Sequence, residues 1–376
     1  MTETVWGKFA PDAPITSPLL GRLETEVCVV GLGGSGLAAL SELTRRGVKS
    51  VGLDAAQIAA GAAGRNAGFL LAGLAGFHHD AIARFGHTRA LACYQATQVA
   101  LAQMASETPS SISVTGSLRI AADAAELVDC EHQFEAMRAD GLAVEEWSGL
   151  EGDGLLFPGD GTLLPVQRCR EMAQRYLTGG GHLYTGTRVL EIEPHRVRCA
   201  SAEIRCEVIL ACVDGGLERL IPSLKGVVRS ARLQMLATAP LAQVVTVRPV
   251  YRRFGYDYYQ QLPTRELVLG GGRDRGGESE WTDKSTTTRS VRIALARWAS
   301  TLTGAEASIS HRWAGVVGYT QSGLPIVREV APRVFAAGGY CGTGNVVGRI
   351  AGRALAELAL DGSSPSAQLF DGPDGR

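Results

Sequence analysis

The feature that most constrains the fold is a glycine pattern near the N-terminus, Gly31-x-Gly33-x-x-Gly36. The apolar run 26–30 before it predicts a buried strand, and the apolar spacing over 35–46 after it predicts a helix. A strand, a glycine turn and a helix in this order place unpaired N–H groups at the helix N-terminus, where they bind a pyrophosphate. The pattern therefore predicts a dinucleotide-binding βαβ unit.

An acidic residue completes this unit. Residues 48–53 predict a second strand, and Asp54 closes it, where a carboxylate accepts hydrogen bonds from an adenosine ribose. Because the same carboxylate would repel a 2′-phosphate, we expect an unphosphorylated adenosine dinucleotide. We expect it to be contacted here by Gly31, Gly33, Gly34, Ser35, Gly36, Asp54 and Ala55.

Two further glycine-rich runs indicate which dinucleotide the chain binds. Gly61–Gly68 and Gly338–Asn345 both present backbone with few side chains, which suits a bulky ring lying against the chain. The second run opens the last predicted helix, and a helix N-terminus aimed at a flavin stabilises its anionic reduced form. The two runs favour FAD over NAD.

Composition limits the remaining possibilities. The 376 residues suggest two to three domains, and the net charge of −1 gives no basis for nucleic acid or an anionic membrane as a partner. The start of the chain lacks the pattern of a signal peptide, and no long apolar run predicts a membrane span, so we expect a cytoplasmic protein. The eight cysteines form no C-x-x-C pair and predict neither a zinc site nor a disulfide framework.

Hydrophobic periodicity predicts the other elements. Helices are expected over 79–104, 122–140, 169–177, 290–302 and 345–360, and strands over 112–121, 182–192, 203–212, 227–238 and 256–270. The polar tail after Gly362 is expected to be disordered.

With these residues in hand, the sequence resembles the D-amino-acid-oxidase superfamily, which includes glycine oxidase, sarcosine oxidase and γ-glutamylputrescine-oxidoreductase-like proteins. The resemblance lies in the first glycine turn with its acid, in the run Gly61–Gly68, in the passage 313–326 and in the turn 339–344. The second feature departs from the family style G-A-S-G-R-N-G-G at Ala63 and Ala67, both small.

The resemblance implies an α/β fold with a Rossmann-like FAD-binding domain of the glutathione-reductase type and a second domain built on a large antiparallel or mixed sheet. It implies a discontinuous FAD-binding domain (1–77, 161–226 and 310–362), a substrate domain (78–160 and 227–309) and a tail (363–376). It also implies that Val189 contacts the adenine side through its backbone and that Ala211 lines the cofactor. The further residues expected at the FAD are Ala62, Gly64, Arg65, Asn66, Gly68, Val189, Ala211, Gly315, Gly339, Gly342, Thr343, Gly344 and Asn345.

Relatives of this kind that tether their flavin use a cysteine at the position of Val317 or a histidine at the position of Arg65. Neither residue can form that bond, so the FAD is expected to be non-covalent. The implied chemistry is oxidation of an amine or amino acid by hydride transfer to the flavin, followed by hydrolysis of the imine.

Candidates for the substrate side are less specific. Tyr256, Tyr258 and Gln260 alternate along one predicted strand, and Tyr258 lies where the family often places an active-site tyrosine, although an aromatic sheet face packed under helices would give the same pattern. The other candidates are His311, Tyr319 and Arg273. The pair His78-His79 has no metal-ligand companion in the sequence, so no metal site is expected.

The electron acceptor stays open. Dioxygen with release of hydrogen peroxide is one possibility, and a quinone or carrier protein is another; a flavoprotein that serves only as a binding module is a third. A position that carries an arginine for the substrate α-carboxylate in glycine-oxidase-like proteins is Val317 here, and Gln260 replaces another arginine. The substrate is therefore expected to be an amine or a modified amino acid.

Overall fold

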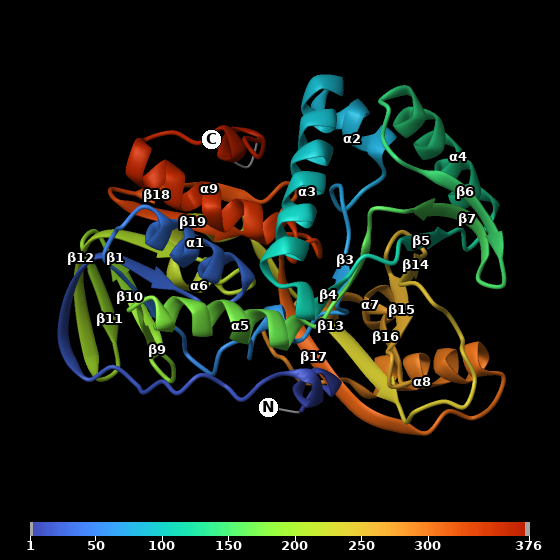
Figure 1. Ribbon diagram of the computed structural model, residues 1–376, viewed down its shortest axis with the longest axis horizontal. Helices are drawn as coiled ribbons and strands as arrows, with labels where there is room; N and C mark the ends of the chain where they lie inside the picture. The colour runs from blue at the N-terminus through green and yellow to red at the C-terminus, as the bar shows by residue number, and fades with distance from the viewer. Residues whose placement is uncertain (1–2, 373–376) are drawn as a thin grey trace. The chain divides into compact units, whose positions relative to one another are not determined.

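The computed structural model describes residues 3–372 (Figure 1). Contacts divide the chain into two compact units, each built from three stretches of sequence. The parallel-sheet unit comprises Lys8–Arg65, Leu164–Ala231 and the residues from Val317 onward. The mixed-sheet unit comprises the described residues up to Gly7, together with Asn66–Leu163 and Arg232–Val316. The contacts place residues 66–77 in the mixed-sheet unit. That one domain binds the cofactor and the other the substrate stays a prediction.

An eight-stranded sheet forms the centre of the parallel-sheet unit. Its order is β10-β11-β12-β1-β2-β9, with β19 beside β12 and β18 beside β19. The pairs of β1 with β2 and β12, of β2 with β9 and of β12 with β19 are parallel. The strands are β1 (Gly21–Val30), β2 (Ser50–Leu53), β9 (His182–Tyr184), β10 (Val189–Glu193), β11 (Arg196–Cys199), β12 (Ala202–Ala211), β18 (Ile326–Ala331) and β19 (Val334–Gly338).

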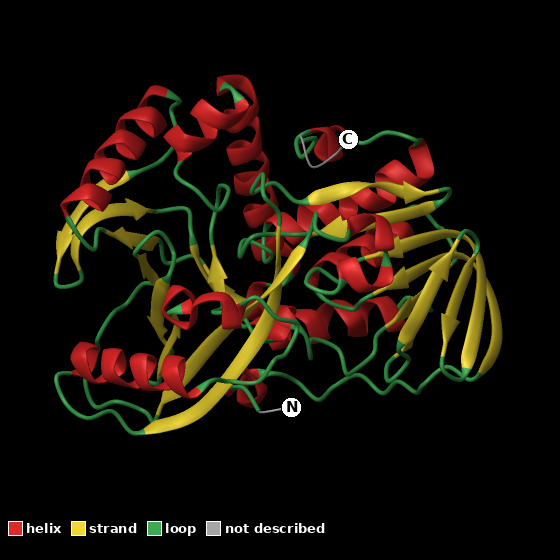
Figure 2. Ribbon diagram, turned by 180° about the vertical axis from the view of Figure 1, so that it is seen from behind, coloured by secondary structure: helices red, strands yellow, loops and turns green. Residues whose placement is uncertain are grey.

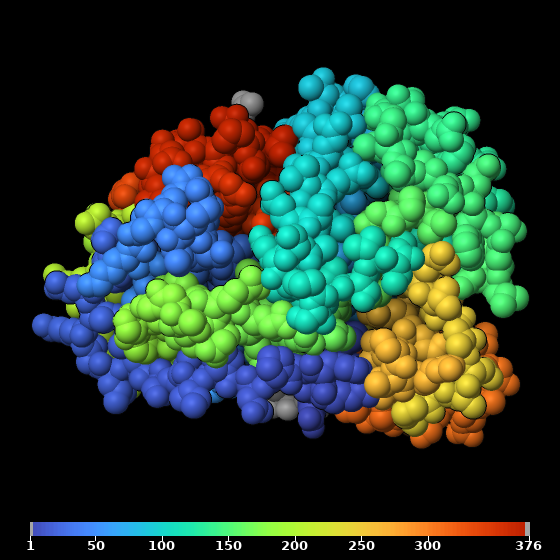
Figure 3. Space-filling model, in the orientation of Figure 1, coloured from blue at the N-terminus to red at the C-terminus, as the bar shows by residue number. Residues whose placement is uncertain are grey.

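Helices pack on this sheet and on each other. They are α1 (Gly34–Arg45), α5 (Pro165–Thr178), α6 (Leu217–Leu220), α9 (Val347–Asp361) and α10 (Pro365–Gln368). Figure 3 shows the green surface of α5 beside the blue surface of α1. The α5 residue Tyr176 donates a hydrogen bond of 2.6 Å to the carbonyl oxygen of Ser50, which fixes this helix to β2. The central strands are apolar because both faces of a parallel sheet are covered.

The mixed-sheet unit is built on a second eight-stranded sheet, of order β17-β13-β16-β15-β14-β5-β7-β6. Figure 2 draws the strands in yellow and the helices in red. Strand β16 pairs antiparallel with β13 and β15, β15 with β14, and β7 with β5 and β6, whereas β14 pairs in parallel with β5. Its strands are β5 (Ser117–Ile120), β6 (Glu145–Gly149), β7 (Gly152–Phe157), β13 (Arg229–Thr238), β14 (Val250–Arg252), β15 (Asp257–Gln261), β16 (Leu267–Gly271) and β17 (Ile309–Tyr319). A small sheet joins β3 (Phe69–Leu70), β8 (Gly161–Leu163) and β4 (Ile112–Ser113).

The helices of this unit are α2 (His78–Phe85), α3 (His87–Glu107), α4 (Ala124–Ala139), α7 (Arg273–Gly276) and α8 (Arg289–Thr303). Helix α8 packs its buried Val291, Leu295 and Ala299 into the same core as Leu118 and Leu269 from the sheet. The α/β class, with a Rossmann-like unit and a unit built on a large mixed sheet, is thus confirmed.

Several predicted elements are interrupted where the backbone turns. The helix predicted over 79–104 is two helices separated at Gly86, and the strand predicted over 112–121 breaks at Gly116. The strand predicted over 182–192 breaks at Gly186, and all three glycines have φ between 64° and 82°. The strand predicted over 256–270 is a hairpin, β15 and β16, whose turn contains Arg265 at φ 75°. Apolar spacing alone does not reveal such left-handed residues.

The chain after Gly362 was expected to be disordered, and this is wrong for its described part. Ser364 accepts a hydrogen bond from the N–H of Ala367 and so caps α10, and Phe370 is buried. The rest of the expected tail, 373–376, lies outside the described residues. Within residues 3–372, no helix combines the length and the apolar character required to span a membrane. All eight cysteines are free thiols, and all except Cys341 are buried.

Candidate functional site

The first glycine turn is closed by contacts that leave no room for side chains. Gly31 follows β1 with φ 100°, and a Cβ there would lie 2.5 Å from the carbonyl oxygen of Cys212. A Cβ on Gly36 would lie only 1.8 Å from the carbonyl oxygen of Gly31. The turn therefore requires glycine at both positions, and it lies between β1 and the start of α1.

The N-terminus of α1 is suited to an anion. Gly33 is its N-cap, and among the described residues no side chain caps it. The first N–H groups of the helix therefore stay available, and the helix dipole favours a negative group there. Gly34 has open space where a Cβ would be, while Ser35 is buried under α9. This backbone cradle fits the pyrophosphate of a dinucleotide.

Asp54 follows β2 and faces the same turn. Its carboxylate accepts hydrogen bonds from the N–H of Leu32 at 2.8 Å and of Ala56 at 2.9 Å. Burial raises the pKa of this carboxyl, and these backbone hydrogen bonds oppose the rise. Its carbonyl oxygen accepts from the N–H of Thr187 at 2.8 Å, which holds the loop before Val189 beside it. A carboxylate has about four acceptor sites, so two hydrogen bonds leave capacity for ribose hydroxyls.

The run Gly61–Gly68 begins next to the phosphate turn. Residues Ala62–Gly64 form a single 3-10 turn, and a Cβ on Gly33 would lie 3.2 Å from the Cβ of Ala63. Gly64 passes so close to Ala59 that its Cβ would lie 2.0 Å from that carbonyl oxygen. Arg65 is buried, and burial lowers its pKa. The first part of the run therefore lies beside the glycine turn, as its proposed cofactor role requires.

The end of the run lies in the mixed-sheet unit. The Asn66 side chain accepts a hydrogen bond from the N–H of Gly68 at 2.8 Å. Gly68 has φ 71°, and a Cβ there would meet the carbonyl oxygen of Leu163 at 2.6 Å. Trp6 donates to the carbonyl oxygen of Asn66 at 3.0 Å and meets Trp313 edge to face at 6.5 Å. Gly315 is buried two residues further along β17.

Two residues that are expected to contact the cofactor lie at the ends of strands in the parallel-sheet unit. Val189 begins β10, and Ala211 ends β12 opposite Val30, with no exposed surface. The N–H of Cys212, which follows Ala211, donates to the carbonyl oxygen of Val30 at 2.7 Å. Ala211 therefore lies directly beside the start of the glycine turn.

The second glycine turn, 339–345, is organised by a residue that sequence reasoning missed. The Asp214 carboxylate accepts hydrogen bonds from the N–H groups of Gly318 at 3.1 Å, Gly339 at 2.9 Å and Tyr340 at 3.3 Å. Burial raises its pKa to about 6. The available signal was an acid followed by two glycines just after the apolar run 208–212, which resembles the place of Asp54 after its own strand.

Within this turn, the Thr343 hydroxyl donates to the carbonyl oxygen of Tyr340 at 2.8 Å. Gly339 and Gly342 have φ 73° and 94°, a region that favours glycine. Helix α9 begins at Val347, two residues after the predicted start, so Gly344 and Asn345 belong to the turn that leads into it. The turn leads directly into the N-terminus of α9, and its place at the flavin stays a prediction.

Two expected substrate residues share one face of β15. Tyr258 is half-buried and meets Phe69 edge to face at 6.1 Å. Gln260 is buried and donates a hydrogen bond to the carbonyl oxygen of Ala67. Between them, Tyr259 points to the opposite face and packs on Trp298. Tyr258 and Gln260 therefore both lie against 67–69, the end of the first glycine-rich run.

The remaining substrate candidates make contacts of their own. Tyr256 precedes β15, and the Arg273 guanidinium lies over its ring at 5.3 Å and over the ring of Trp281 at 4.9 Å. His311 contacts the Ser310 hydroxyl at 2.9 Å. Tyr319 belongs to the parallel-sheet unit, where a Cβ on Gly342 would lie 3.9 Å from its hydroxyl oxygen.

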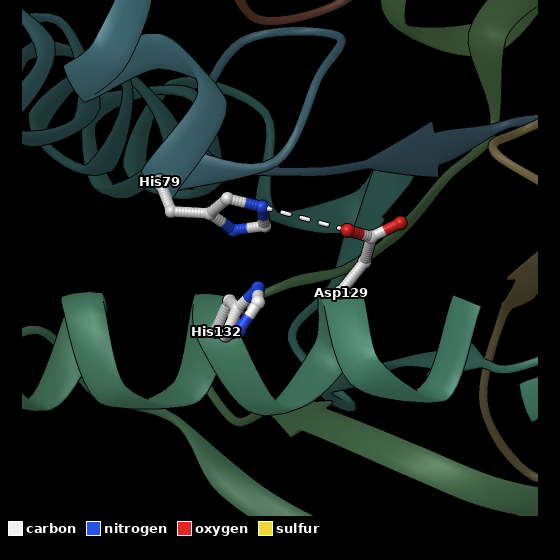
Figure 4. Close-up of side chains that lie close together, drawn as sticks. All are labelled: His79, Asp129 and His132. Carbon is white, nitrogen blue, oxygen red and sulfur yellow. Dashed lines mark ion pairs between the residues drawn. The ribbon is translucent and has the colours of Figure 1, made fainter. Parts of the chain in front are cut away.

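The histidine pair expected to lack metal-ligand companions has them in space. His78 contacts the Asp140 carboxylate at 2.7 Å. His79 lies beside Asp129 and His132, which come from another helix (Figure 4). Helix packing, rather than sequence spacing, brings these three side chains together, so the sequence alone did not reveal the group.

Comparison with known proteins shows the family of the chain. The family model described as "FAD dependent oxidoreductase" matches residues 26–358. The chain is 26% identical to the probable oxidoreductase OrdL of Rhizobium meliloti, covering 94% of this chain and 87% of that protein. It is 24% identical to gamma-glutamylputrescine oxidoreductase of Escherichia coli, covering 95% and 89%.

A solved structure shows the same fold. Glycine oxidase from Geobacillus kaustophilus superposes with a TM-score of 0.77 at 18% identity, over 94% of this chain and 98% of that one. Because the family model covers nearly the whole chain, from β1 into α9, this protein belongs to the family of FAD dependent oxidoreductases.

Proposed function

We propose that this protein oxidises the carbon–nitrogen bond of an amine or a modified amino acid, that the imine product is hydrolysed, and that dioxygen is consumed with release of hydrogen peroxide. The proposal rests first on membership of the family and on the similarity to gamma-glutamylputrescine oxidoreductase along 95% of the chain. It rests also on the first glycine turn, whose close backbone contacts leave no room for side chains and whose helix N-terminus has no side-chain cap.

When bound, FAD would supply the acceptor of a hydride, which carries both electrons of the oxidation. The chain's own residues would bind and orient it: the N-terminus of α1 would hold the pyrophosphate, and Asp54 would hold the ribose. Asp214 fixes the backbone of the second glycine turn through its hydrogen bonds to Gly339 and Tyr340. We assign Tyr258 and Gln260 to the substrate, because they share one sheet face beside the first glycine-rich run.

The proposed preference for an amine follows from the lack of a side-chain cation to pair with a substrate α-carboxylate. Val317 and Gln260 offer no cation. Arg253 is paired with Asp257 at 2.9 Å and with Asp274, and the Arg273 guanidinium lies over the rings of Tyr256 and Trp281. Burying a carboxylate without a compensating cation costs several kcal/mol of binding free energy. Removing one partner of a buried ion pair, for comparison, costs about 3 to 5 kcal/mol. A substrate without a free α-carboxylate avoids this cost.

The test compares kcat/KM for matched pairs, each an amine and its α-carboxylated analogue. We expect at least a tenfold preference for the amine, about 1.4 kcal/mol of transition-state binding. A clear preference for the free amino acid would refute the substrate proposal while leaving the FAD assignment intact. Peroxide measured in the same assays distinguishes dioxygen from a quinone or carrier protein as the acceptor.

We further propose that the FAD is not covalently attached, since Val317 and Arg65 stand at the two positions from which relatives tether it. Flavin should remain in the supernatant after acid precipitation. A cytoplasmic location stays part of the proposal.

A further inference from the structure

Three side chains with metal-binding chemistry meet on the mixed-sheet unit. His79 lies in the first turn of α2, while Asp129 and His132 lie three residues apart on α4 and so share one face of that helix. One ligand atom from each lies within 4.8 Å of the others. Figure 4 shows the side chains from the two helices pointing toward one another.

Neighbouring contacts hold the two helices in place. His78, beside His79, contacts the carboxylate of Asp140, the C-cap residue of α4, at 2.7 Å. His87, at the start of α3, contacts the same carboxylate at 2.5 Å. The ring of His79 packs 5.4 Å from that of Phe77, a residue of the local core. The backbone positions of the three side chains are therefore fixed without any help from the cluster itself.

The His79 ring is poorly satisfied by its protein neighbours. Its Nδ1 is buried and has no hydrogen-bond partner among the described residues. Its Nε2 lies 3.7 Å from an Asp129 oxygen and 3.6 Å from an Asp80 oxygen, both beyond the roughly 3.2 Å limit of a good hydrogen bond. Two carboxylates thus lie near one imidazole without forming a good hydrogen bond to it, and this arrangement favours binding of a cation.

The ligand set indicates the class of cation. Two imidazoles and one carboxylate suit Zn²⁺, Co²⁺, Ni²⁺ or Cu²⁺, whereas Mg²⁺ and Ca²⁺ prefer sets of oxygens. With metal–ligand distances of about 2.1 Å, tetrahedral ligand atoms lie about 3.4 Å apart. The pair of His79 and Asp129 is already near this value, and His132 is exposed and can rotate toward it.

We propose that His79, Asp129 and His132 form a binding site for a divalent transition metal that links α2 to α4. The fourth position is left to water or to Asp80. This inference does not depend on the substrate or the electron acceptor proposed above.

The test uses tag-free, FAD-loaded protein dialysed against ZnCl₂, with bound zinc and flavin both quantified. We expect one zinc per chain at micromolar concentration and a higher Tm with zinc than with EDTA. Asp129→Asn and His132→Gln should each weaken zinc binding by about tenfold or more, since each removes a direct ligand. Their Tm in EDTA should match that of the wild type, because both positions are at least partly exposed.

Glu135→Gln is the matched control, because it removes an exposed acid from the same helix outside the cluster. It should bind zinc like the wild type. Co²⁺ gives a second readout, a visible absorption band of the ligated ion that His132→Gln should abolish. Zinc binding that is unchanged in Asp129→Asn and His132→Gln, that is lost equally in Glu135→Gln, or that requires millimolar metal would overturn the proposal.

Discussion

Gly36 and Gly34 lie two residues apart in the first glycine turn and differ in the space around them. A Cβ on Gly36 would lie 1.8 Å from the Gly31 carbonyl oxygen, whereas a Cβ on Gly34 would meet nothing within 4 Å. We predict that Gly36→Ala abolishes FAD retention, because the turn must open to admit the methyl group. Gly34→Ala should keep its FAD and gain about 0.5 to 1 kcal/mol of helix stability. Flavin content per chain after gel filtration is the measurement, and equal retention in both variants would contradict the role of the turn.

A buried carboxyl in the mixed-sheet unit gives a prediction about pH. Asp160 accepts hydrogen bonds from the Ser117 hydroxyl at 2.7 Å and the Ala72 N–H at 2.8 Å. Burial raises its pKa to about 7, above the value of about 3.9 expected for an unfolded chain. The native state therefore holds this proton more tightly than the unfolded state does. Its contribution to stability falls as the pH rises from about 4 to about 7, and the cost of the buried charge is complete above that range.

Asp160→Asn keeps an acceptor for Ala72 and removes the titration. When the pH is raised from about 5 to about 8.5, the free energy of unfolding of the variant should increase relative to that of the wild type by on the order of 2 kcal/mol. The measurement is the difference in Tm between the two FAD-loaded proteins at both pH values. If this difference in Tm is the same at both pH values, or favours the wild type at the higher pH, then ionisation of Asp160 does not destabilise the native state and the prediction is wrong.

At the scale of elements, α9 approaches the N-terminal turn of α1 through a single glycine. A Cβ on Gly352 would lie 2.0 Å from the Ser35 carbonyl oxygen, while one on Gly348 of the same helix would be in ordinary contact with Tyr340 at 3.5 Å. We predict that Gly352→Ala costs about 1 to 3 kcal/mol through overpacking and weakens FAD binding by displacing α1. Gly348→Ala should leave both nearly unchanged. Titration of the apoprotein with FAD, followed by flavin fluorescence, separates these outcomes, and wild-type affinity in Gly352→Ala would show that α9 does not position the turn.

The elements also show which information the sequence carries. The βαβ unit around Gly31–Asp54 could be predicted because its strand, turn and helix are adjacent in the chain and each has a local signal. The breaks at Gly86, Gly116 and Gly186 were missed because the apolar spacing continues on both sides of a residue with positive φ. Asp214 was missed because its partners, Gly318 and Gly339, are distant in sequence, although its position after an apolar strand was visible.

At the scale of the whole molecule, local motifs predicted the family and the cofactor, whereas side-chain clusters depended on packing. The group of His79 with Asp129 and His132 joins two helices whose arrangement no sequence pattern specifies. Arg273 was a candidate for the substrate side, and only the structure places its guanidinium over the rings of Tyr256 and Trp281. Tyr258 and Gln260, by contrast, share a face because strand alternation is a property that sequence does encode.

The central claim is that this chain uses FAD to oxidise an amine or amino acid. The most direct test mixes the purified protein with a panel of amines and amino acids under anaerobic conditions, records the visible spectrum, and then admits air. We predict a yellow protein whose flavin absorption is bleached by at least one amine and returns in air with formation of hydrogen peroxide. A colourless protein that binds NADP, or a flavin that no member of the panel reduces, would contradict the account.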